Sequence, residues 1–173
     1  MVNSSLGSEE YGRYVVNAYL QDKLLSQNNG FKTITFTQDP YDPVDILYTT
    51  VKDKKIAVEV KVRGKFYKDF IYEQSKAAGL EKYKEEGYQL VYANVVEENQ
   101  RIYFWNVTDI SKIGGAYKSY CPCPSSSYAA NPYIKDKCVY NLPVSSTFLQ
   151  DDISAYLDRY NQLKSLPNPA KMS

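Results

Sequence analysis

The chain has 173 residues, 43% of them hydrophobic, and a formal net charge of +1. These values are typical of a globular protein with one core, and no run is long and apolar enough to span a bilayer. The near-zero charge does not by itself indicate nucleic-acid binding. The sequence has no histidine, which excludes every histidine-dependent triad and most catalytic zinc sites.

The three cysteines, Cys121, Cys123 and Cys138, are too few for a closed zinc site and are odd in number. With no apolar N-terminal run resembling a signal peptide, we expect reduced thiols and a cytoplasmic location. We expect one domain over residues 1–165 and a disordered tail over residues 166–173.

The first predicted element is an amphipathic helix over residues 7–26 with Ser8 as its N-cap. At about 100° per residue, Glu9 falls near the middle of the apolar stripe and Glu10 at its margin. A buried carboxylate needs a partner, so Glu9 is the first candidate for a site residue and Glu10 the second. The alternative is that both are surface residues that compensate the helix dipole. A strand over residues 31–37 follows.

Two further strand-like runs, 44–50 and 55–62, flank a turn that we centre on Asp53. This register predicts Asp45 opposite Lys61 and Leu47 opposite Glu59. Directly opposed residues share a face and alternate residues along a strand do too, so Asp45, Glu59 and Lys61 project from one side. A shift by one residue would separate them. Two carboxylates beside an amine are the layout of a divalent-metal site.

The segments Pro43-Val44-Asp45 and Glu59-Val60-Lys61 resemble the signature of the PD-(D/E)XK nuclease superfamily. The resemblance implies that Asp45 and Glu59 hold Mg²⁺ (or Mn²⁺) and that Lys61 is the catalytic amine. It also implies that an acidic residue of the first helix, Glu9 or Glu10, reaches toward the metal.

A second helix is predicted over residues 71–86, ended by Gly87, and a strand over residues 88–96. This order matches the restriction-endonuclease-like αβββαβ core, an α/β fold with a mixed central sheet flanked by helices, over residues 7–107. Gln74 and Lys76 stand where many relatives place a further active-site residue, and Lys76 is the better candidate. Some relatives carry Gln followed four residues later by Tyr, whereas Ala78 stands there in this chain. The alternative for Lys76 is an exposed helix charge.

After a strand over residues 101–107, the segment 111–137 is rich in Gly, Pro and Ser and predicts a long irregular excursion, either a lid over the active face or a surface insertion. A short strand over residues 138–144, with Pro143 marking an edge, and a last helix over residues 148–163 capped by Thr147 are the predicted C-terminal additions.

Candidate nucleic-acid contacts lie around the hairpin and the loop after it, where basic residues crowd together: Lys52, Lys54, Lys55, Lys61, Arg63, Lys65 and Lys68. The alternative is a solvated sheet edge, which accounts for about half of such runs, and edge lysines also protect sheets from aggregation. Of the 18 tyrosines, most are assigned to packing, and three near the proposed site are candidate substrate contacts. The basic candidates for DNA binding are Arg63, Lys65 and Lys68, and the tyrosines are Tyr41, Tyr48 and Tyr67.

These observations predict a magnesium-dependent nuclease that hydrolyses phosphodiester bonds in DNA, in a setting that for many members of the superfamily is a phage or mobile element. Two other hypotheses stay open. The first is a catalytically silent binding or assembly module of the same fold, and the second is a structural protein in which Glu59 and Lys61 form a surface ion pair. Cutting both strands of a duplex needs two active sites, which is compatible with a homodimer, although no segment identifies an interface.

Overall fold

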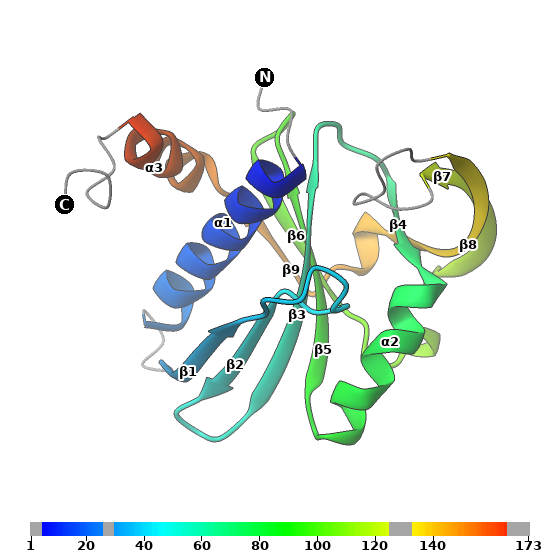
Figure 1. Ribbon diagram of the computed structural model, residues 1–173, viewed down its shortest axis with the longest axis horizontal. Helices are drawn as coiled ribbons and strands as arrows, with labels where there is room; N and C mark the ends of the chain where they lie inside the picture. Colours follow the sequence, from blue (N-terminus) through cyan, green and yellow to red (C-terminus); the bar gives the residue numbers. More distant parts are fainter. Residues whose placement is uncertain (1–4, 26–29, 125–132, 166–173) are drawn as a thin grey trace.

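A computed structural model describes residues 5–25, 30–124 and 133–165 of the chain (Figure 1). Its elements contain the predicted succession of one helix, three strands, a helix and a strand, with additions after the third and the last of these strands. In chain order they are α1 (Ser5–Leu25), β1 (Phe31–Phe36), β2 (Ile46–Thr50), β3 (Lys55–Arg63), β4 (Asp69–Glu73), α2 (Gln74–Glu85), β5 (Gln89–Val96), β6 (Arg101–Asn106), η1 (Ile110–Lys112), β7 (Tyr117–Pro124), β8 (Ile134–Pro143), η2 (Val144–Ser146), β9 (Leu149–Asp152) and α3 (Ser154–Ser165).

The central sheet is mixed and has six strands in the order β1-β2-β3-β5-β6-β9. Strands β3 and β5 pair in parallel and all other neighbours pair antiparallel. Every residue of β5 after Gln89 is buried, as expected of an inner strand with both faces covered. The protein is therefore an α/β fold with a mixed central sheet flanked by helices, as the sequence predicted.

Helices α1 and α3 lie on one face of this sheet, and α2 lies on the other with a small sheet of order β4-β8-β7 (Figure 1). Each face has its own core, because β3 and β5 are apolar on both sides. The α1 side is built around Val16, Val58 and Phe104. The α2 side is built around Leu80 and Trp105.

Helix α1 approaches β3 closely at Gly12. A Cβ atom at this position would lie 2.8 Å from Val62 Cγ2 and 2.9 Å from Val60 Cγ1, closer than side-chain carbons pack. The glycine therefore sets the distance between α1 and the strand that carries Glu59 and Lys61.

The predicted register of the β2–β3 hairpin is wrong by two residues. Leu47 pairs with Ala57 and not with Glu59, because the tight turn closes with Asp53 in the left-handed region at φ 59°. A shift of two residues preserves the side-chain alternation, so the predicted sharing of one face by Asp45 and Glu59 is confirmed. The shift brings these two carboxylates closer than predicted.

Several predicted boundaries are wrong because pairing with distant strands overrides local pattern. Residues 71–73, predicted as helix, belong to β4, where Phe70 and Tyr72 alternate into the core and pair with β8. Helix α1 begins at Ser5, ahead of the predicted cap at Ser8. The predicted last helix over residues 148–163 begins only at Ser154, since residues 149–152 form β9 against β6.

The segment 111–137, predicted as an irregular excursion, is largely regular secondary structure where the structure describes it, and residues 125–132 lie outside the described residues. It holds η1, the strand β7 and the start of β8, and β7 pairs with β8 along eight residues. Pro122 and Pro124 fit here because β7 is the outer strand of its sheet, where a missing N–H group is tolerated. Strand β8 lies between β4 and β7, so the prediction that Pro143 marks an edge strand is wrong.

The predicted tail, residues 166–173, lies outside the described residues. Among the helices that the structure describes, none combines the length and hydropathy needed to cross a membrane.

Candidate active site

The site is built where β2 begins, opposite the middle of β3. Extending the pairing of Ile46 with Val58 by one residue places Asp45 beside Glu59, and the Asp45 N–H donates to the Val58 carbonyl at 2.9 Å. The exposed fractions of Asp45 and Glu59 are only 6% and 3%. Two carboxylates are thus buried side by side, an arrangement that is costly unless positive charge or a proton compensates it.

The cost of burying the two groups changes the pKa of Glu59. Burial, and then the neighbouring Asp45 charge, raise the pKa of Glu59 to about 8, against the lowering effect of Lys61 and Lys76. Burial and the neighbouring Asp45 therefore favour the protonated form of Glu59 near neutral pH when no metal ion is bound.

Two ammonium groups from different elements meet at Glu59. Lys61 Nζ lies 3.7 Å and Lys76 Nζ 3.4 Å from Glu59 Oε1. Lys61 follows on the same strand and Lys76 reaches across from α2, so the structure brings together four of the five predicted catalytic residues: Asp45, Glu59, Lys61 and Lys76. With a side-chain exposed fraction of 29%, Lys76 is half-buried and not a freely exposed helix charge.

The charge state of Lys61, which the sequence left open, follows from its surroundings. Burial favours the neutral amine, but the Glu59 carboxylate, with Tyr92 and Asp45, outweighs burial and raises the pKa of Lys61. Lys61 is therefore an ammonium ion at neutral pH.

Arg13 is a site residue that the sequence analysis missed. Its Nε and Nη2 atoms donate to Asp45 Oδ1 at 3.1 and 3.0 Å, and its Nη1 donates to the Thr37 carbonyl at 3.1 Å. The other Asp45 oxygen, Oδ2, accepts from the Val60 N–H at 2.7 Å. The available signal was its position one turn after Glu9 on the same helix face.

The two candidate acids of the first helix separate in space. Glu9 Oε1 lies 3.9 Å from Arg13 Nη2, so Glu9 reaches the edge of the site through Arg13. Glu10 instead points to α3, where its Oε2 accepts from Lys164 Nζ at 3.3 Å. Of the two, only Glu9 lies near Asp45.

Polar groups on neighbouring strands extend the site face. Asn94 pairs with Lys61 in the parallel β3–β5 ladder and is fully buried. Within the described part of the chain, the Asn94 Nδ2 atom and the buried Tyr72 hydroxyl have no hydrogen-bond partner. Such groups are commonly satisfied by water or a ligand, and here they lie on the side of the sheet that carries Lys61.

The three predicted DNA-binding residues differ in what they contact. Arg63 turns inward, donating to Asn94 Oδ1 at 3.1 Å, to the Tyr92 hydroxyl at 3.0 Å and to the Ile71 carbonyl at 3.2 Å. Lys65 and Lys68 are exposed in the β3–β4 loop. Of the three predicted residues, Lys65 and Lys68 present their side chains to the surface.

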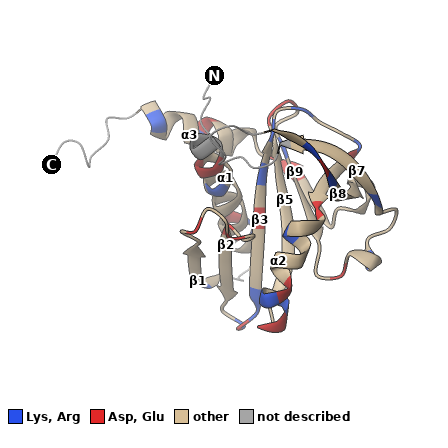
Figure 2. Cartoon of the chain, turned by 45° about the vertical axis from the view of Figure 1, so that its right-hand side comes forward, with Lys and Arg blue, Asp and Glu red and all other residues tan. Residues whose placement is uncertain are grey.

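The basic run seen in the sequence is two groups. Lysines of the β2–β3 turn and those of the β3–β4 loop stand at opposite ends of β3, about 25 Å apart for a strand of this length. Figure 2 shows basic and acidic positions distributed along β3, α1 and α2. In the part of the chain that the structure describes, the two ends of β3 therefore carry separate groups of lysines.

The candidate substrate tyrosines also divide. Tyr48 is fully buried and its hydroxyl donates to Asn17 Oδ1 at 3.1 Å, so the prediction of a substrate contact at Tyr48 is wrong. Tyr41 and Tyr67 are 74% and 54% exposed. The packing role predicted for other tyrosines is confirmed for Tyr19, Tyr72, Tyr83, Tyr92 and Tyr103, all of which are buried.

The carboxylate oxygens of Asp45 and Glu59 are the type of ligand that a hard divalent cation binds. Asp45 and Glu59 are adjacent carboxyl groups, and a cation between them would relieve the repulsion between their charges. Among the described residues no group of three or more Asp, Glu, Cys or His side chains is placed to hold a metal ion, so water and substrate oxygens would complete the coordination. Magnesium is commonly bound in this way.

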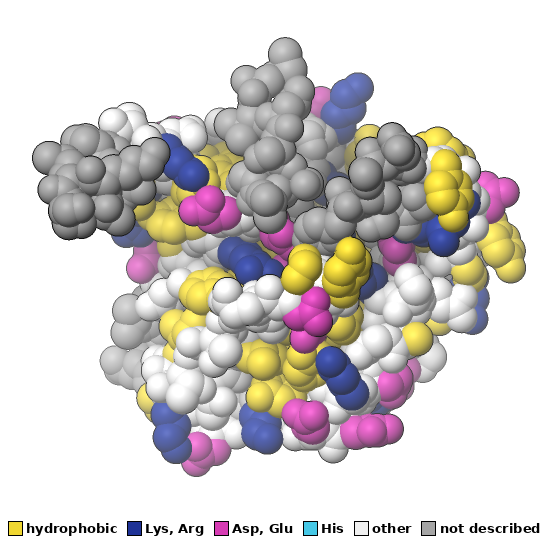
Figure 3. Space-filling model, in the orientation of Figure 1, with side chains coloured by type: hydrophobic (Ala, Val, Ile, Leu, Met, Phe, Trp, Pro, Cys, Tyr) yellow, Lys and Arg dark blue, Asp and Glu magenta, His cyan; other side chains and the backbone are white. Residues whose placement is uncertain are grey.

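In Figure 3 acidic and basic side chains lie among apolar ones near the middle of the visible face.

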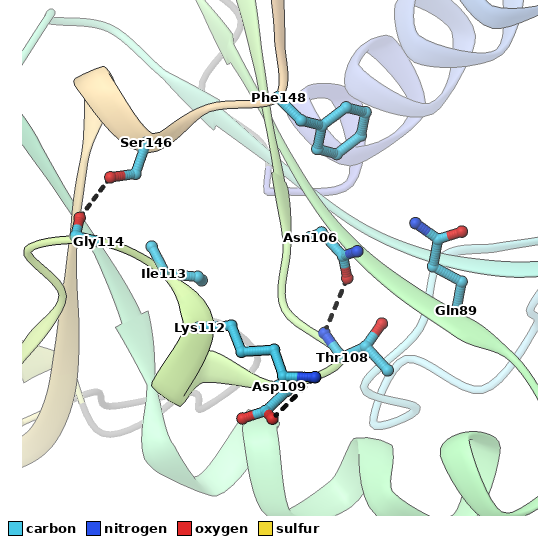
Figure 4. Close-up of a pocket in the computed structure, with 9 residues that line it drawn as sticks. All are labelled: Gln89, Asn106, Thr108, Asp109, Lys112, Ile113, Gly114, Ser146 and Phe148. Atoms are coloured by element: carbon cyan, nitrogen blue, oxygen red, sulfur yellow. Dashed lines mark hydrogen bonds and ion pairs between the residues drawn. The ribbon is translucent and has the colours of Figure 1, made fainter.

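The molecule also has a pocket away from Asp45 and Glu59. It is lined by residues from the start of β5, the end of β6, η1 and η2, with side chains such as Asn106 and Ser146 (Figure 4). It contains no residue of the site described above.

No family model matches the chain, and no curated protein matches it. Among solved structures, the Holliday junction resolvase Hjc from Archaeoglobus fulgidus, an archaeal hyperthermophile, aligns with a TM-score of 0.45 and 14% sequence identity, over 80% of this chain and 96% of that one.

Proposed function

We propose that this protein is a divalent-metal-dependent nuclease that hydrolyses phosphodiester bonds in DNA. The observation that carries the proposal is the pair of buried, adjacent carboxylates, Asp45 and Glu59, with the ammonium groups of Lys61 and Lys76 on Glu59. Two acids that can hold a metal ion, beside charged amines, are one arrangement that supports hydrolysis of a phosphodiester. The resemblance of these segments to the PD-(D/E)XK signature agrees with this assignment.

Asp45 and Glu59 would hold Mg²⁺ or Mn²⁺, which supplies Lewis-acid polarisation of the phosphate and lowers the pKa of a bound water. Lys61 is charged, and its side chain is 39% exposed, so it can contact a phosphate oxygen and stabilise charge that develops on it. Lys76 is a second ammonium at the same carboxylate and can orient the same phosphate.

DNA would reach the site from the carboxyl end of β3. Lys65 and Lys68 follow this strand end in an exposed loop, where they can contact the phosphates of the backbone. The aromatic rings of Phe66 and Tyr67 are exposed in the same loop, at 38% and 54%, and offer faces on which bases can stack.

The second candidate function is a catalytically silent module of the same architecture. The observation that favours it is Arg13, which already neutralises Asp45. Such a module would bind DNA or another protein without cleaving it, and its affinity would not depend on divalent cations.

The test is a titration of the protein with Mn²⁺ and Mg²⁺ while cleavage of supercoiled, linear, single-stranded and branched DNA is followed. Asp45→Asn and Glu59→Gln remove one ligand charge each. Asp53→Asn is the matched control, since Asp53 is on the same hairpin, is exposed and has a left-handed φ that Asn also adopts. Metal-dependent cleavage present in the control and lost in both ligand variants supports the nuclease, whereas metal-independent DNA binding without cleavage supports the silent module.

We propose a homodimer if the enzyme cuts both strands of a duplex, since each protomer holds one site. Sedimentation of the protein with and without DNA tests this. A monomer that cleaves both strands in one encounter would contradict it.

A further inference from the structure

Arg13 makes more polar contacts than a surface ion pair needs. All three guanidinium nitrogens donate, two to Asp45 Oδ1 and one to the Thr37 carbonyl, and the side chain is only 21% exposed. The guanidinium therefore lies against the carboxylate that the proposed function assigns to the cation.

The hydrogen bonds leave Asp45 with little spare capacity. A carboxylate offers about four lone-pair sites. Arg13 takes two on Oδ1 and the Val60 N–H takes one on Oδ2, which leaves about one site on Oδ2. A cation can bind both oxygens of Asp45 only if one of these partners withdraws. The Val60 N–H is fixed in the sheet, so the partner that can withdraw is Arg13.

The charges around Asp45 and Glu59 also indicate that Arg13 is the group that a metal ion would replace. Arg13, Lys61 and Lys76 supply three positive charges around Asp45 and Glu59, so the pair is already compensated before any metal arrives. Lys61 and Lys76 contact Glu59, and Arg13 is the cation at Asp45.

We infer that Arg13 is an exchangeable counter-ion of Asp45, which it releases to a divalent cation, and that its freed guanidinium then binds a phosphate of the DNA. This inference rests on the proposed function. A planar guanidinium matches the paired oxygens of a phosphate as well as those of a carboxylate. The long side chain can pivot from α1 between the two while Glu9, one turn earlier, keeps a carboxylate near it.

The experiment measures Mn²⁺ binding by calorimetry without DNA, and DNA binding in Ca²⁺, for Arg13→Gln. Removal of the competing charge is expected to tighten Mn²⁺ binding at least tenfold, while DNA binding weakens at least tenfold. Arg159→Gln is the matched control, because Arg159 pairs with Asp22 on the exposed surface, each about half exposed, and both affinities should stay unchanged.

Mn²⁺ affinity that is unchanged or weaker in Arg13→Gln, measured on protein that melts as the parent does, overturns the inference and makes Arg13 a structural clamp. If Arg13→Gln does not fold, Arg13→Lys replaces it: the retained charge should keep Mn²⁺ affinity near that of the parent, while loss of the paired donors weakens DNA binding. Equal DNA binding by Arg13→Lys and the parent would contradict the phosphate contact.

Failure of the inference and failure of the proposed function give different results. If the parent binds Mn²⁺ and cleaves DNA but Arg13→Gln has the same Mn²⁺ affinity, only the inference fails. If Arg13→Gln binds Mn²⁺ and the parent neither binds it nor cleaves DNA, the counter-ion role holds and the nuclease does not. If neither protein binds Mn²⁺, both are refuted.

Discussion

Replacement of Glu59 by Gln should make the metal-free protein more stable at high pH than the parent. The pKa of Glu59 is raised from 4.5 to about 8 in the folded protein, so between these values the folded state holds a proton that the unfolded state has lost. The free energy of unfolding of the parent then falls as pH rises across this interval. Each pH unit costs about 1.4 kcal/mol, and the loss reaches several kcal/mol by pH 8.

Gln keeps the shape of the side chain and cannot ionise, so the variant should lack this pH dependence. The assay is guanidinium denaturation with EDTA at intervals from pH 5 to pH 9, followed by the fluorescence of Trp105, the single tryptophan, which is fully buried. Contributions of titrating groups that do not contact Glu59 cancel in the difference between the two proteins. A difference in unfolding free energy that stays constant from pH 5 to pH 9 would refute a raised pKa at Glu59.

Three further outcomes follow from the geometry. Gly12→Ala should lower the free energy of unfolding by about 1 to 3 kcal/mol, because the added Cβ would lie within 3 Å of Val60 and Val62; urea denaturation measures this. Gly64→Ala, where nothing lies within 4 Å of the added carbon, should change the same quantity by less than about 0.5 kcal/mol, and an equal effect of both variants would contradict the close helix contact. Lys61→Ala should reduce metal-dependent cleavage at least about 100-fold while the denaturation midpoint changes little, and an unchanged cleavage rate would remove Lys61 from the proposed chemistry.

Local sequence pattern predicted the elements that carry the site. The alternation in Lys55–Arg63 and the short turn before it indicated the hairpin and the common face of Asp45 and Glu59. The turn position was harder to read, and the register was wrong by two residues. The prediction that Asp45 and Glu59 share a face was still correct, because the direction of side chains repeats every two residues along a strand.

The C-terminal half was predicted less well, since its strands form only by pairing with distant segments. Strand β4 pairs with β8 about 70 residues later, and β9 pairs with β6. Prolines that locally indicate a loop are accommodated on the outer strand β7. Neither the propensity nor the periodicity of these segments contains that information.

The sequence by itself determined which groups could do the chemistry, because residue type and the two-residue repeat of a strand place Asp45, Glu59 and Lys61 on one face. Only the tertiary structure decided which charges surround them. Lys76 arrives from α2 and Arg13 from α1, on opposite faces of the sheet, and the distance between such groups depends on how helices pack against the strands. Burial, which raises the pKa of Glu59, likewise exists only once both cores have closed around the site.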